Sequence, residues 1–560
     1  MVHNRVVATL QGAMAGVILA VTPLVAFAGG DAELGRKLYW EGIGADGMPV
    51  HGKTQGDVPV SGAQFSCVNC HRPSGFGTSE GGNYVPPIIG PVLYEKRTPN
   101  RNRMFKELYQ EVQPPGFWAR VRQPRIRPAY DQPLLARALK EGLDAAGRPL
   151  DPIMPRYELS KDDVSNLDAF LKTLSAEISQ GVGETEIHLA TIIGPDADPD
   201  EKKAILDTMN LFTTWMNKDT EGDTSKPTFS PRYRSEFIKA YRYWNLHVWE
   251  LEGPPETWRA QLEAKYAEQP VFATVGGLVP GPWDEIGKFC DDKRLPCILP
   301  NTELPTPGEG RYGYSVFFNR GLPLEAEVLA MYLADSETVP NQIVQIRAAG
   351  PSGERPANAL SDAVAMMMEN TDVQTVTYED ADSLRAALAK HADAEVLVVW
   401  PDDPEAAVDA LADINPPSKM IVLPSATKDE AAAGLSKDLI DRTLVVWPYD
   451  KPDSYHPRKY RIRAWMHTRR LNVTHPRLQL QTYYALTMMQ YGLLHAINDF
   501  HRDYLMEIIE HEAENELNPG THPELGLGPG QRFASKGAFI AKLAPEERVG
   551  YRVISDWIVP

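Results

Sequence analysis

The sequence predicts a multidomain protein in which an all-α domain is followed by a two-lobed α/β domain with parallel sheets. A compact Cys/His motif near the N-terminus is flanked by amphipathic helical segments, and after about residue 187 apolar strand-length runs alternate with helices. The length of 560 residues exceeds what one hydrophobic core usually supports. With 43% hydrophobic and 24% charged residues, the composition is that of a globular protein and excludes a disordered or multi-span membrane chain.

The N-terminus has the features of a secretory signal. Arg5 precedes a long apolar run that ends in the small-x-small sequence Ala26-Phe27-Ala28. We expect residues 1–28 to be removed and the mature chain to begin at Gly29 in the periplasm, with any membrane association made through a partner. The alternative is an uncleaved membrane anchor. The formal net charge of −18 argues against nucleic acid as a partner.

The stretch FSCVNCHRPSGFG, residues 65–77, holds two of the four cysteines. In CxxCH, the thiols of Cys67 and Cys70 add to the two vinyl groups of haem, and His71 becomes the proximal ligand of the iron. A thioredoxin-like pair would sit at the end of a βαβ strand, and a zinc site would need a second Cys/His pair at usable spacing. The motif therefore predicts one covalent haem c.

The flanks of the motif agree with this interpretation. Residues 31–43 form an amphipathic pattern before it, and a last helix is expected from about Ser160 to Leu174. Met154 lies on a proline-flanked loop between the later helices, where its thioether could reach the open face of the haem. The alternative is a core methionine. The competing ligands are Met48, Met104 and His51.

These residues and flanks resemble class I c-type cytochromes, and the resemblance covers about residues 29–180. The positions carried over are Cys67, Cys70, His71 and Met154. The chain departs from the simplest members in a long insert, roughly residues 44–64, and in Arg72, where glycine is frequent. The resemblance implies an electron carrier rather than an enzyme, with a periplasmic dehydrogenase, oxidase or another cytochrome as its redox partner.

A basic segment between Lys96 and Arg127 carries nine Lys or Arg residues in an otherwise acidic chain. It could be a solvated face, a set of partners for the haem propionates, or a docking site for an acidic redox partner. After Leu174 the chain becomes polar and glycine-containing, which predicts a linker at residues 181–186.

Residues 187–560 show the pattern of a second domain, and their number is too large for one open sheet. The segments PVFATVGGLVPGPWDEIGKFCDDKRLPCILPNTELP (270–305) and YSVFFNRGLPLEAEVLAMYLAD (314–335) resemble type I periplasmic solute-binding proteins of the branched-chain amino acid class. The resemblance covers most of residues 187–460 and implies two α/β lobes with a small-molecule ligand bound between them.

In that family, ligand contacts come from the loops at strand ends, where parallel sheets bind ligands in general. The candidates carried over are Gly276, Gly277, Asn301 and Thr302, with Tyr449 and Asp450 as weaker ones. The alternative for the glycines is a turn that joins strand to helix. The small hydroxyl residues of the family are replaced by Leu278, Val279 and Pro280, which argues against an amino acid as the ligand.

Cys290 and Cys297 lie between the end of an expected helix and the start of a strand. In an exported protein this spacing favours a short-loop disulfide over a pair of buried thiols.

Three functions follow from the sequence. The main hypothesis is an exported monohaem c-type cytochrome in a periplasmic redox chain, whose second domain serves for docking or ligand sensing. The alternative is a solute-binding or sensing protein of a transport system with a redox-modulating haem. The third is a periplasmic oxidoreductase that uses the binding domain as a substrate cleft.

Overall fold

The computed structural model describes residues 30–80, 83–96, 126–224, 242–306, 308, 312–427, 434–452, 454–513, 517–545 and 550–560. The chain divides into two compact units. The first comprises Met1–Cys67 with Tyr130–Lys172, and the second comprises Val68–Ala129 with Thr173–Pro560. The predicted signal peptide and most of the predicted basic segment lie outside the described residues. At the end of that segment, the buried Arg127 side chain donates hydrogen bonds to main-chain oxygens of Val92 and Leu93.

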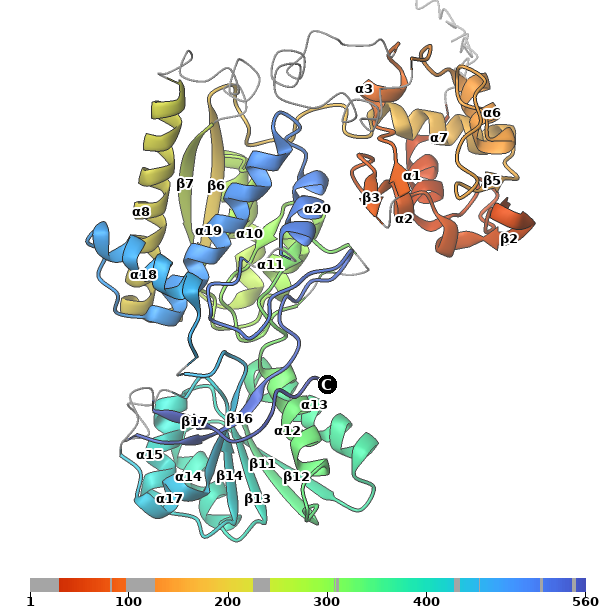
Figure 1. Ribbon diagram of the computed structural model, residues 1–560. Helices are drawn as coiled ribbons and strands as arrows, with labels where there is room; N and C mark the ends of the chain where they lie inside the picture. The colour runs from red at the N-terminus through yellow and green to blue at the C-terminus, as the bar shows by residue number, and fades with distance from the viewer. Residues whose placement is uncertain are drawn as a thin grey trace, which may run out of the picture. The chain divides into compact units, whose positions relative to one another are not determined.

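The first unit combines three helices with a small antiparallel sheet of strand order β2-β1-β5 (Figure 1). Its elements are α1 (Ala32–Glu41), β1 (His51–Thr54), η1 (Gln55–Asp57), β2 (Val58–Ser61), η2 (Gly62–Phe65), α6 (Gln132–Glu141), β5 (Arg156–Tyr157) and α7 (Lys161–Thr173). The prediction of an all-α domain was wrong in this respect. Residues 51–61 form a hairpin in which Gly56 adopts φ 77°, and each of its strands has only four residues.

Helices α1 and α6 begin and end in the same way, which the sequence analysis missed. The side chains of Asp31 and Asp131 accept backbone hydrogen bonds from the first turn of each helix. Gly42 and Gly142 end the helices with φ of 67° and 70°, a left-handed conformation that glycine adopts without steric cost. The helix-turn unit at residues 31–50 is therefore repeated at 131–150.

The second unit begins at Val68, directly after the first cysteine of the CxxCH motif, and its first segment runs to Leu93. Its elements are α2 (Val68–His71), β3 (Thr78–Glu80), β4 (Asn83–Val85) and α3 (Gly90–Leu93). β3 and β4 pair as an antiparallel hairpin. The Gly90 amide donates to the carbonyl of Leu174, which ties the segment to the chain that leads into the α/β part.

The first lobe is built on a parallel sheet of strand order β10-β9-β8-β6-β7. Its strands are β6 (Glu186–Ile193), β7 (Tyr243–Glu250), β8 (Ala273–Val275), β9 (Cys297–Ile298) and β10 (Ser315–Val316). Its helical elements are α8 (Pro199–Thr224), η4 (Pro255–Thr257), α10 (Trp258–Glu268), α11 (Asp284–Asp292), α18 (Pro457–Thr468), α19 (Pro476–Ala496) and α20 (Arg502–Glu512).

The second lobe has a seven-stranded sheet of order β12-β11-β13-β14-β15-β16-β17. Strand β16 runs antiparallel to both of its neighbours, β15 and β17. Its strands are β11 (Gln342–Ala348), β12 (Asp372–Tyr378), β13 (Val396–Trp400), β14 (Met420–Leu423), β15 (Thr443–Trp447), β16 (Phe539–Leu543) and β17 (Tyr551–Val553). Helices α12 (Leu322–Ala334) and α13 (Pro351–Met367) pack on one face, and α14 (Ala381–Lys390), α15 (Pro404–Ile414) and α17 (Lys437–Arg442) pack on the other (Figure 1). The predicted α/β lobes with parallel sheets are confirmed.

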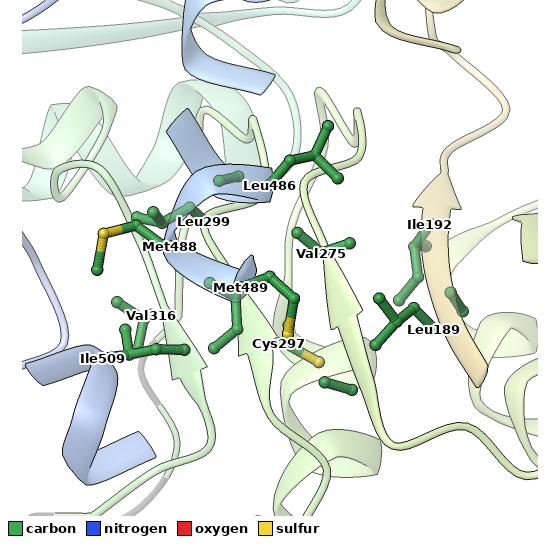
Figure 2. Close-up of a cluster of buried hydrophobic side chains, with 14 of the residues drawn as sticks. Leu189, Ile192, Val275, Cys297, Leu299, Val316, Leu486, Met488, Met489 and Ile509 are labelled. Carbon is green, nitrogen blue, oxygen red and sulfur yellow. The ribbon is translucent and has the colours of Figure 1, made fainter. Parts of the chain in front are cut away.

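The C-terminal part of the chain completes the core of the first lobe. Figure 2 shows Leu486, Met488 and Met489 of α19 beside strand residues such as Val275 and Val316. All these side chains are fully buried. Helix α19 also packs against α8 and α20. A chain that has already crossed to the second lobe thus returns to bury its apolar residues on the first sheet.

Candidate functional site

The loops at the carboxyl ends of strands from both lobes meet in one polar group, which we call the interlobe cluster. Its members are Glu303, Glu325, Ser425, Tyr449, Arg477 and His522. Glu303 follows β9, Ser425 follows β14 and Tyr449 follows β15. The edge at which parallel strands end is where α/β proteins bind ligands.

Glu325, in the first turn of α12, is the most buried acid of the cluster, with 2% of its surface exposed. Its carboxyl group accepts hydrogen bonds from the Ser425 amide, at 2.9 Å, and from the Ser425 hydroxyl, at 2.5 Å. Burial raises the pKa of Glu325 to about 8, although the two bonds from Ser425 act in the opposite direction. The carboxyl group is therefore largely protonated at neutral pH.

Arg477, in the first turn of α19, supplies the positive charge of the cluster. Its guanidinium carbon lies 4.2 Å from the centre of the Tyr449 ring, a cation–π contact. Burial raises the pKa of Glu303 to about 7, and the positive charge of Arg477 opposes that shift. No sequence pattern identified Arg477, because it lies in the C-terminal stretch that carried little family signal.

His522 adds a buried polar atom to the cluster. Its imidazole is fully buried and stacks on the Phe318 ring, with centroids 5.4 Å apart, and lies 5.5 Å from the Tyr449 ring. Burial, reinforced by the charge of Arg477, lowers the pKa of His522 to about 3, so the ring is neutral. Its Nε2 has no hydrogen-bond partner within the described part of the chain. This is unusual, because most buried polar atoms in proteins are hydrogen-bonded.

The two predicted glycines shape the loop after β8. Gly276 and Gly277 adopt φ of 56° and 109°, conformations that other residues rarely take. A Cβ at Gly277 would lie 2.4 Å from the main-chain oxygen of Ile192. The turn and the close approach of β6 account for both glycines without a ligand.

The predicted polar candidates differ in their surroundings. Asn301 donates from its side-chain amide to the Gly277 oxygen at 3.0 Å, and Thr302 donates from its hydroxyl to the Gly281 oxygen at 3.1 Å. Both side chains thus stabilise the strand-end loops themselves. Tyr449 is the predicted candidate that the structure brings into the interlobe cluster.

In the second unit, His71 is buried and its ring contacts a main-chain carbonyl. The imidazole is 9% exposed, and its Nδ1 lies 3.1 Å from the Pro86 oxygen. Burial lowers the pKa of His71 to about 4, so the ring is uncharged at neutral pH. With Nδ1–H donating to Pro86, the lone pair is on Nε2, as in most metal-binding histidines.

In the first unit, a small, mainly apolar hollow adjoins the first cysteine of the motif. Its lining includes Leu38, Val50, Phe65, Cys67, Leu139, Leu159 and Leu167. A porphyrin held by Cys67 would find apolar side chains beside it here. Met154 is half-buried and is not among the lining residues, and the competing Met48 is 62% exposed.

The disulfide between Cys290 and Cys297 is confirmed. Their Cα atoms are 6.6 Å apart, within the range for a disulfide, and both residues are fully buried. The bond joins α11 to the first residue of β9. Because β9 leads toward Asn301 and Glu303, the disulfide also restrains the strand that precedes the first-lobe part of the interlobe cluster.

Within the described ranges, no helix is long and apolar enough to cross a bilayer. In the same part of the chain, no three His, Cys, Asp or Glu residues are grouped in a way that could hold a metal ion.

No family model and no curated protein matches the sequence. Solved structures do match. A fatty acid ABC transporter substrate-binding protein from Thermomonospora curvata is 15% identical and covers 68% of this chain and 95% of its own, with a TM-score of 0.51. A substrate-binding periplasmic protein from Ralstonia solanacearum is 10% identical and covers 66% of this chain and 100% of its own, also with a TM-score of 0.51.

A third similar structure, the substrate-binding protein of an ABC transporter from Aeropyrum pernix, is 11% identical and covers 67% of this chain and 96% of its own, with a TM-score of 0.51. At these identities the similarity defines the fold. The chain therefore contains a domain with the fold of type I periplasmic binding proteins. The predicted resemblance of the α/β part is confirmed at that level.

Proposed function

We propose that this chain is an exported solute-binding protein that holds a small polar molecule between its two α/β lobes and carries one covalent haem. The interlobe cluster carries the first part of this proposal, because both lobes contribute charged or hydrogen-bonding side chains to it. The structural neighbours named as substrate-binding proteins support the same function. The exported location rests on the predicted signal peptide.

The cluster offers a solute a specific set of contacts. Glu303 and Glu325, with pKa values raised to about 7 and 8, can donate as well as accept hydrogen bonds at neutral pH. Arg477 offers a guanidinium to an acceptor group, and the Tyr449 ring offers an apolar face. A solute that touches both lobes binds the closed state more tightly than the open one, so binding favours closure.

A thermal-shift screen of small polar solutes on the full mature protein, followed by calorimetric titration of the hits, tests this function. Arg477→Met should weaken binding at least tenfold, because it removes the charge of the cluster. The matched control is Arg385→Met, which removes an arginine that pairs with Asp413 at the surface of α14. Equal affinity of both variants, or no binding by any solute, would contradict a solute site at the cluster.

The haem is the second part of the proposal. Cys67 and Cys70 would hold it covalently, and His71 and Met154 would be its axial ligands. When bound, it would supply one-electron redox chemistry. The neutral, Pro86-bonded imidazole and the apolar hollow beside Cys67 support this assignment. The double variant Cys67→Ser and Cys70→Ser should lack the covalent haem absorbance of the purified parent protein. A mature wild-type protein without haem would refute the assignment of the haem.

Electron transfer to a periplasmic dehydrogenase, oxidase or cytochrome is the second candidate function, favoured by the CxxCH motif together with the buried His71. Stopped-flow reduction of the haem by such a partner tests it. Transfer that is no faster than with a non-cognate protein would leave solute binding as the function of the chain.

A further inference from the structure

The loop that follows the haem motif, residues 72–76, is held on helix α20 of the first lobe. Ser74 donates two hydrogen bonds to the carboxyl group of Glu507, one from its amide and one from its hydroxyl, each 2.7 Å long. Both oxygens of Glu507 are thereby engaged. Ser74 is fully buried, so these bonds are shielded from water.

A buried ion triad lies one turn further along α20. Arg72 and Arg532 each approach one oxygen of Glu510 at 2.7 Å. The side chains of Arg72, Arg532 and Glu510 are 9%, 5% and 4% exposed, respectively. Desolvated charges are tolerated only with partners, so removing Glu510 would take one carboxylate partner away from two buried arginines.

Arg72 is also conformationally unusual. It has φ of 67°, in the left-handed region that glycine adopts without cost and arginine does not. This is the position at which the resemblance to cytochromes leads one to expect glycine. The arginine keeps this conformation while its side chain pairs with Glu510.

Aromatic and main-chain contacts complete the attachment. The Phe76 ring stacks on Tyr504 of α20, with centroids 4.2 Å apart and planes inclined by 16°. The Gly75 amide donates to the Arg72 oxygen at 3.1 Å, and the Gly77 amide donates to the His71 oxygen at 3.1 Å. Because these short bonds link the loop to His71, anchoring Arg72 and Ser74 restricts the orientation of the imidazole.

We propose that Glu507 and Glu510 are positioning residues for the proximal haem ligand, and that through them the solute-binding lobe holds the haem motif in a defined orientation. This inference rests on the proposed haem at His71. The two glutamates act on His71 through Arg72 and Ser74.

The test uses the full mature haem-loaded protein and the variants Glu507→Gln and Glu510→Gln. The matched control is Glu250→Gln, since Glu250 pairs with Lys202 at the surface of the same lobe and is 55% exposed. Amide hydrogen exchange of residues 72–77 reports on the attachment, and the low-spin electron paramagnetic resonance spectrum of the ferric haem reports on the orientation of the histidine.

Each positioning variant should keep its covalent haem, exchange the amides of residues 72–77 at least tenfold faster than the parent, and show shifted resonance values. The control should match the parent in both readouts. If Glu510→Gln does not fold, Ser74→Ala is tested instead. This variant removes one bond to Glu507 without leaving a charge unpaired. Its amide exchange and resonance values should change in the same direction, by a smaller amount. Parent-like exchange and spectra in haem-loaded variants would overturn the inference, whereas a parent protein without covalent haem would refute the proposed function instead.

Discussion

Replacing Cys290 and Cys297 together by alanine should destabilise the first lobe by a calculable amount. The bond closes a loop with a sequence separation of 7. For a loop of this size, the chain-entropy model gives about 2.5 kcal/mol of stabilisation at 25 °C. Since about 1.4 kcal/mol corresponds to a factor of ten, amides that exchange through unfolding of the lobe should exchange about 70-fold faster. The space left by two buried sulfur atoms adds to this loss.

Hydrogen exchange followed by mass spectrometry measures this effect strand by strand. Peptides that contain β8 and β9 should show the acceleration, and peptides from β11 and β13 in the second lobe serve as the internal control. Protection of β8 and β9 within twofold of the parent would refute the reasoning. An equal loss in both lobes would refute it too, because the disulfide would then not act on the first lobe alone.

Three further outcomes are expected. Glu303 and Glu325 have raised folded-state pKa values of about 7 and 8, so their contribution to stability is complete below the unfolded value of about 4.3 and is lost as pH rises through 7 and 8. Glutamine at both positions should therefore flatten the fall in melting temperature between about pH 5 and 8, and an unchanged slope would contradict this. Met154→Ala should open the sixth coordination position and lower the reduction potential. An unchanged spectrum would mean that another residue, and not Met154, binds the iron. Arg477→Met should change solute affinity but leave the covalent haem content equal to that of the parent.

Local patterns carried the accurate part of the sequence prediction. The alternation of apolar runs and helices identified β6 to β9 and β11 to β15, because a buried parallel strand is recognisable within its own few residues. It did not identify β10, β16 and β17. Ser160 caps α7, as expected, by accepting from the Asp163 amide at 3.0 Å. The Cys290–Cys297 disulfide was predictable because only a short stretch separates its ends. The hairpin of β1 and β2 was missed because each strand has only four residues and β2 contains a proline, which is unfavourable in most strands.

The sequence by itself determined the CxxCH motif, most of the strands and helices of the two lobes, and the disulfide, all of which depend on residues close together in the chain. Only the tertiary structure decided which side chains share the interlobe cluster, since Glu303 lies in the loop after β9 and Arg477 lies in the first turn of α19. It also decided that the haem-motif loop is held by α20, through Arg72 and Glu510, which are 438 positions apart. An ion pair of that separation leaves no periodic trace in the sequence, because its energy depends on the burial and mutual approach of groups that only the folded chain brings together.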